Sequence, residues 1–112
     1  MNRNRLIELF ISNLANSIVH QILEKAIDEP MFIDKYRHEL KNSWQIAKKY
    51  RDKINPIDRN LPFHDIHEIK TKLMNKVNSE LKLRINKNYK NINLSLVEPF
   101  VDNALRGLKV IE

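Results

Sequence analysis

The chain has 112 residues, with 20 Lys or Arg against 14 Asp or Glu, so its formal net charge is +6. This length fits a single domain, residues 1–112, and the one Gly and four Pro suit long helices rather than a glycine-loop or strand-rich fold. The absence of Cys excludes disulfides and thiolate metal sites and favours a reduced, cytoplasmic setting. Polar residues interrupt the apolar N-terminal stretch, so we expect neither a signal peptide nor a membrane partner.

Residues 3–28 predict a long helix with two adjacent rows of apolar side chains, each repeating every four residues. Because a four-residue step overshoots a helical turn by about 40°, the rows wind about 200° around the axis and must cross their partners obliquely. So wide a stripe indicates either the central helix of a bundle or a helix partly covered by a second copy, most simply in a two-fold dimer. The rows are Leu6, Phe10, Leu14, Ile18, Ile22 and Ala26, and Ile7, Ile11, Ala15, Val19, Leu23 and Ile27. His20 falls among the polar positions and is expected at a surface or an interface.

Residues 32–53 predict a second helix, separated from the first by Pro30. Apolar residues seven apart mark one side of it, and basic residues lie on the other side. Pro56 and Pro62 bound a polar loop, residues 55–64, that no helix would cross.

The third helix is expected at about 65–86, with Asp65 as its N-cap and Glu68 three residues later. Its apolar ridge repeats every four residues up to Ile85. Residues 81–85 also alternate as a strand would, but the ridge continues through them, so we expect a helix.

A polar connection, residues 86–93, leads to a last helix at about 96–109. Ser95 and Glu98 have the spacing of a capping box, Pro99 would stand in the first turn, and Gly107 would end the helix. The predicted fold is therefore all-α, a four-helix bundle or irregular helical array with the long first helix at its centre.

The positive charge gathers in two regions, because residues 30–54 hold seven basic against three acidic side chains and residues 65–93 also have a net charge of about +4. Basic residues with tyrosines among them are typical of surfaces that bind phosphate backbones and stack unpaired bases. The predicted nucleic-acid-binding residues are Lys41, Lys48, Lys49, Arg51, Lys53, Lys82, Arg84, Lys87, Tyr89 and Lys90. The same cations would also suit an acidic protein partner.

Two other motifs suggest chemistry. His64 and His67 with Glu68 have the donor types of a zinc site, but a further ligand would be needed, so we expect no metal and no cofactor. The stretch from Arg59 to His64 resembles the Arg-x4-His motif of the HEPN superfamily, all-α proteins that include metal-independent RNases, and Asn60 matches its polar second position. The resemblance implies that Arg59 would stabilise a phosphate and that His64 would be the acid–base or orienting group. Pro62 departs from the helical setting of that motif.

The sequence thus predicts a small, basic, non-enzymatic interaction module. We expect it to self-associate as a dimer through the first helix and to bind DNA, RNA or an acidic protein. The alternative is a HEPN-like RNase that uses Arg59 and His64.

Overall fold

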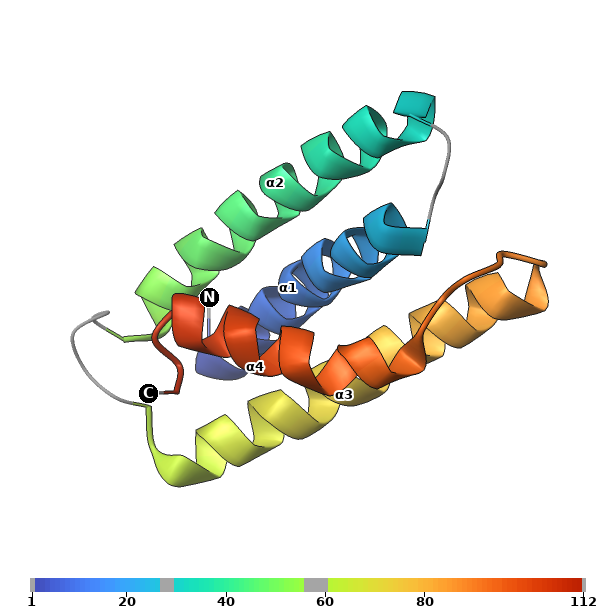
Figure 1. The fold of residues 1–112 in the computed structure, drawn as a ribbon. Coiled ribbons are helices and arrows are strands. Elements are labelled where there is room, and N and C mark those ends of the chain that lie inside the picture. Colours follow the sequence, from blue (N-terminus) through green and yellow to red (C-terminus); the bar gives the residue numbers. More distant parts are fainter. Residues whose placement is uncertain (1, 27–29, 56–60, 112) are drawn as a thin grey trace.

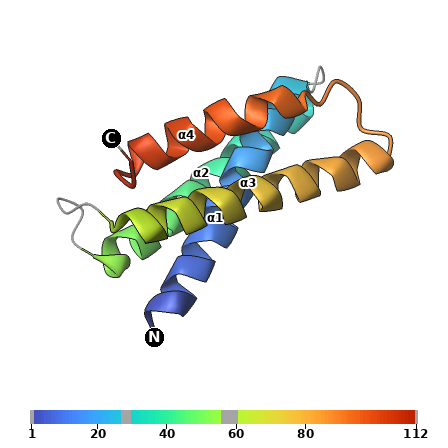
Figure 2. The same cartoon turned by 90° about the horizontal axis from the view of Figure 1, so that it is seen from below.

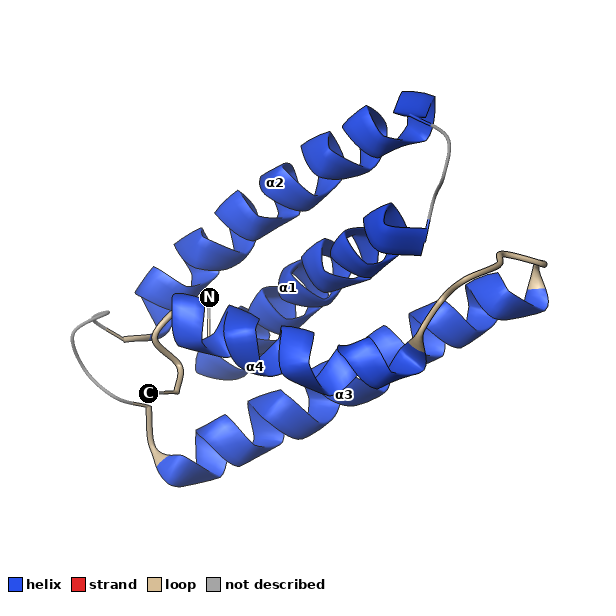
Figure 3. Ribbon diagram, in the orientation of Figure 1, coloured by secondary structure: helices blue, strands red, loops and turns tan. Residues whose placement is uncertain are grey.

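The computed structural model describes residues 2–26, 30–55 and 61–111, and in them the chain forms four α-helices and no strand. The helices are α1 (Arg3–Ala26), α2 (Pro30–Ile54), α3 (Phe63–Asn86) and α4 (Val97–Gly107), with a short 3₁₀ turn, η1 (Leu94–Leu96), directly before α4 (Figure 1 and Figure 3). The predicted all-α helical array is confirmed.

Helix α1 lies at the centre of the array and packs against the other three helices. Helix α2 runs back along α1, whereas α3 and α4 cross α1 obliquely, as the winding of its apolar rows predicts (Figure 2). Leu14 and Ile18 are almost completely buried within this single chain. Ala15 and Val19 of the second row are buried as well, so the chain itself covers the middle of both rows and a dimer would have to use other residues. Ile27, the last member of the second row, lies outside the described residues.

Polar side chains that interrupt the apolar rows of α1 bond to α2. The Ser17 hydroxyl donates a hydrogen bond to the Leu40 carbonyl at 3.0 Å. The Asn16 amide donates to the Ser43 hydroxyl at 2.5 Å. Ser17 and Ser43 are buried, so these bonds satisfy groups that would otherwise destabilise the α1–α2 seam.

The starts of α2 and α3 differ from the prediction. Helix α2 begins at Pro30, whose fixed φ and missing N–H suit a first turn. Helix α3 begins at Phe63 with Pro62 at its N-cap, so the prediction that Asp65 caps it is wrong. Asp65 instead lies in the first turn and forms an ion pair with Arg3 of α1.

The capping box predicted for the last helix is also wrong. The side-chain oxygen of Asn93 accepts hydrogen bonds from the Ser95 backbone N–H at 3.0 Å and from the Ser95 hydroxyl at 2.6 Å. These bonds start the η1 turn, and α4 follows one turn later with Pro99 in its first turn, as predicted. The continuous helix predicted across residues 81–85 is confirmed.

Helices α3 and α4 both end with a non-glycine residue in the left-handed region, Asn88 at φ 69° and Lys109 at φ 57°. In each, backbone bonds close the last turn in the Schellman pattern. Gly107 therefore does not supply the left-handed residue that ends α4. It lies against the indole of Trp44, and a Cβ there would stand 3.3 Å from that ring, so close packing between α2 and α4 explains the glycine.

Among the described residues, α1 is the one helix that is long and apolar enough to cross a membrane by length and composition, a feature that the sequence analysis did not expect. Most of its apolar stretch is buried by the other helices. The core helix of a soluble protein and an N-terminal signal sequence share these properties.

Candidate nucleic-acid interface

Helix α2 buries one side against α1 and turns its other side to solvent. Ala47 and Arg51 lie on the buried side, and Tyr36 and Trp44 pack partly against the core. The opposite half of α2 carries exposed side chains from Asp34 to Lys53. The exposed lysines of this half, here called the α2 basic face, are Lys35, Lys41, Lys48, Lys49 and Lys53.

The lysines of the α2 basic face differ from two lysines of α3 in their ion pairs. Lys72 donates to Glu68 at 2.6 Å, and Lys70 lies 3.0 Å from Asp102 of α4. Within the described ranges, no carboxylate forms an ion pair with Lys41, Lys48 or Lys49 of the α2 face. Lys76 and Lys82 of α3 likewise form no ion pair with a described carboxylate, so the α2 basic face is distinguished by its five exposed lysines on one helix and not by the lack of ion pairs alone. Lys35 and the neighbouring Arg37, which is exposed but binds Glu24 at 2.6 Å, were missed as site residues although they share this outer side.

Arg51 does not belong to this surface, which corrects its prediction as a nucleic-acid-binding residue. Its side chain is fully buried and donates to the carbonyl oxygens of Leu108 and Lys109, both at 3.1 Å, and to the Asn55 side-chain oxygen at 2.6 Å. Burial lowers the pKa of Arg51, while the charge of Asp52 opposes that shift. The guanidinium binds the carbonyl end of α4, where the helix dipole favours a cation.

The two predicted basic segments do not form one patch. Residues 48–53 end α2 at one end of the molecule, whereas residues 82–90 end α3 at the other (Figure 1). Lys82, Lys87 and Lys90 are exposed. Arg84 is half-buried and lies 3.4 Å from Glu80, one turn earlier. The second segment instead approaches the first half of α2, where Tyr89 is near enough to Tyr36 to help raise its pKa.

A polar network links three parts of the fold behind this contact. His20 is buried, which corrects the expectation of a surface or interface position. One ring nitrogen lies 2.7 Å from the Asn16 carbonyl and the other pairs with the Glu39 carboxylate of α2. The ring also packs against Tyr36, with centroids 5.5 Å apart. Burial and the neighbouring Tyr89 raise the pKa of Tyr36. No local sequence signal pairs these residues, because they come from separate segments.

The residues of the RNase alternative are only partly placed. Arg59 lies outside the described residues. His64 stands in the first turn of α3 with 88% of its side chain exposed, 3.7 Å from Glu68. Among the residues that the structure describes, no three His, Asp or Glu side chains gather to hold a metal ion.

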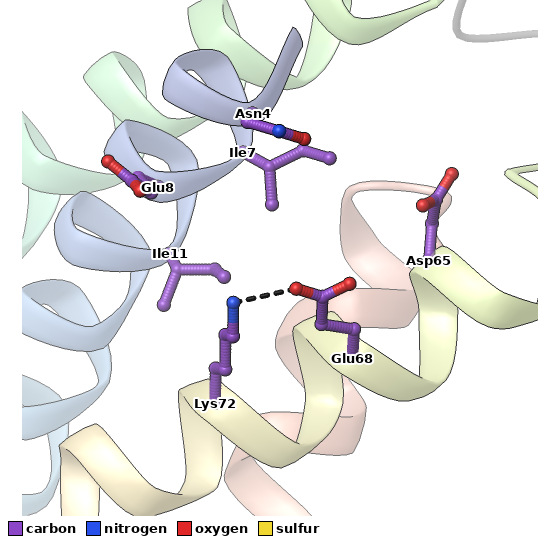
Figure 4. A pocket seen from close by; sticks show the side chains of 7 residues that line it. All are labelled: Asn4, Ile7, Glu8, Ile11, Asp65, Glu68 and Lys72. Carbon is purple, nitrogen blue, oxygen red and sulfur yellow. Dashed lines mark hydrogen bonds and ion pairs between the residues drawn. The ribbon is translucent and has the colours of Figure 1, made fainter.

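A groove runs between α1 and α3, away from the α2 basic face. One hollow in it has a volume of about 340 Å³ and is lined by Asn4, Ile7, Glu8, Ile11, Asp65, Glu68 and Lys72 (Figure 4). A hydrogen bond from Lys72 lowers the pKa of Glu68, and one from Arg3 lowers the pKa of Asp65. Ion pairs within the protein already satisfy these two carboxylates, so the groove offers no free catalytic acid or base among them.

Compared with known protein families, curated proteins and solved structures, the chain matches none.

Proposed function

We propose that this protein is a cytoplasmic, non-enzymatic nucleic-acid-binding module that contacts phosphate backbones through the α2 basic face. The observation that carries the proposal is that α2 carries five exposed lysines on its outer side. Lys41, Lys48 and Lys49 are exposed with no ion pair in the described part of the chain, whereas Lys70 and Lys72 are paired. Unpaired lysines give up little when they bind phosphate, because no internal partner has to be displaced.

The shape of this surface also suits an extended polyanion. Lys35 and Lys53 lie 18 residues apart on one helix, which is about 27 Å at 1.5 Å per residue. A band of cations of that length on one side of a helix can follow several consecutive phosphates. An acidic protein surface would satisfy the same charges, but it rarely presents evenly spaced anions over such a distance. We therefore favour nucleic acid over an acidic protein.

The proposal is tested by fluorescence anisotropy with a labelled DNA strand, in the presence and absence of its complement, over a range of salt concentrations. If the α2 basic face binds phosphates, the triple variant Lys41→Gln, Lys48→Gln, Lys49→Gln should weaken binding. It should also reduce the slope of log affinity against log salt by about 1 for each phosphate that is no longer bound.

The matched control is the triple variant Arg5→Gln, Lys72→Gln, Lys76→Gln, which removes the same charge from exposed positions on the α1–α3 groove. This control should keep most of the affinity for the DNA and most of the slope of log affinity against log salt. Equal losses in both variants would mean that net charge alone attracts the nucleic acid. No binding by the wild type at low salt would refute the proposal and leave an acidic protein as the partner to seek.

Self-association is a further part of the proposal. Leu14 and Ile18 are buried within the chain, so a dimer that involves α1 would have to form around them, through residues that remain exposed. Size-exclusion chromatography with light scattering, at high salt after nuclease treatment, distinguishes a dimer from a monomer. A monomer at high protein concentration would refute this part without affecting the nucleic-acid proposal.

A further inference from the structure

Apolar surface remains exposed where α3 ends. Leu83 is 55% exposed, Ile85 is 39% exposed and Tyr89 is 44% exposed. Lys87 and Lys90 stand on either side of Tyr89 in the sequence and are exposed as well. An exposed aromatic ring with a lysine close to it on each side in the sequence combines a stacking surface with phosphate-binding charge.

The backbone that carries Tyr89 is held in place. Its N–H donates to the Arg84 carbonyl at 3.0 Å, and the Asn88 N–H donates to the Ile85 carbonyl at 3.0 Å. Asn88 takes the left-handed conformation that this closing turn requires. A ring on a fixed turn loses little conformational entropy when it binds a ligand.

The side chain also has a neighbour on α2, because the interaction with Tyr89 helps to raise the pKa of Tyr36. Tyr36 in turn packs against the buried ring of His20, which bonds to Asn16 and Glu39. The exposed tyrosine is therefore joined through Tyr36 to the seam between α1 and α2.

Resting on the proposed function, we infer that the nucleic acid is single-stranded and that an unpaired base stacks on Tyr89 while Lys87 and Lys90 contact the adjoining phosphates. Stacking requires a free base face, which a continuous duplex does not offer in its interior. The lysines of α2 bind either form through the backbone, and Tyr89 adds affinity for the single strand only.

The test compares a labelled strand of about 12 nucleotides, a length within the usual range for single-strand-binding sites, with the same strand annealed to its complement. Tyr89→Leu removes the ring but keeps an apolar side chain. We expect it to weaken single-strand binding by about 5- to 150-fold, the equivalent of 1–3 kcal/mol per stacked base, and to change duplex binding by less than about 2-fold. Tyr89→Phe keeps the ring and should retain most of the single-strand affinity.

The outcomes separate this inference from the proposed function. If the wild type binds both forms and Tyr89→Leu leaves single-strand affinity unchanged, the stacking role is overturned while the α2 basic face stands. If Tyr89→Leu weakens both forms equally, Tyr89 acts on the fold or on general affinity, and the inference is again overturned. If the wild type binds neither form, both proposals fail. Thermal unfolding of each variant, followed by circular dichroism, checks that the fold is intact.

Discussion

Replacing the buried Arg51 with Met should destabilise the protein, because Met fills a similar volume but donates no hydrogen bond. The change removes two bonds of 3.1 Å to the carbonyls of Leu108 and Lys109 and one of 2.6 Å to Asn55. Bonds from a charged group contribute about 1.5–3 kcal/mol each, and a carbonyl left without a partner in a buried site costs about 1–3 kcal/mol. Removing the buried charge recovers part of its desolvation cost, so we expect a net loss of about 2–4 kcal/mol.

Urea unfolding measures this loss with two probes. Far-ultraviolet circular dichroism follows all helices, and the fluorescence of Trp44, the single tryptophan, follows the packing of α2 on α4 at Gly107. If Arg51 holds the end of α4, the fluorescence transition of the variant should come at lower urea than the circular dichroism transition. The matched control is Lys49→Met, an exposed change on the same helix, which should alter stability by less than about 0.5 kcal/mol. A loss below about 1 kcal/mol for Arg51→Met would refute the reasoning.

Three further changes test other parts of the packing. Helix propensity alone would raise the free energy of unfolding of Gly107→Ala by about 1 kcal/mol, but the added Cβ would stand 3.3 Å from the Trp44 ring, so we expect a smaller gain. A gain of the full ~1 kcal/mol in thermal unfolding would contradict this. Arg3→Gln should cost about 1 kcal/mol at pH 7, since Arg3 is half-exposed. The Arg3 bond lowers the pKa of Asp65, so this difference should persist above pH 3.8 and shrink as the pH falls below it; a difference that stays constant in acid would exclude the ion pair as its source. Leu14→Ala should cost about 2–5 kcal/mol by denaturant unfolding, and a smaller loss would mean that its site is not tightly packed.

The predictions that held depend on periodicity. The four-residue rows of α1 require partners around a wide arc, and α2, α3 and α4 supply them. The apolar ridge that predicted α3 includes Ile69 and Leu81, and both are fully buried. Predictions of which helix face is buried are reliable because they depend on many similar side chains, so an error at one position changes little.

The predictions that failed concern single polar residues with two available partners. Asp65 has the residue type of a helix cap, but Arg3, 62 residues earlier, binds its carboxylate. Ser95 has the spacing of a capping box, but its neighbour Asn93 accepts the bonds that start the turn. A polar side chain takes whichever partner lies within about 3 Å, and a sequence cannot rank a distant partner against a near one.

The amino-acid sequence by itself determined the helical class, the wide apolar stripe of the first helix and the surplus of positive charge, because local periodicity and composition settle all three. Only the tertiary structure decided which cations are available. It buried Arg51 under the end of α4, paired Lys70 and Lys72 with carboxylates, and left Lys41 and Lys48 exposed on α2. The physical reason is that the residue type of a lysine or arginine fixes its charge. Whether that charge is paired or exposed depends on which carbonyls and carboxylates the packed helices bring within reach.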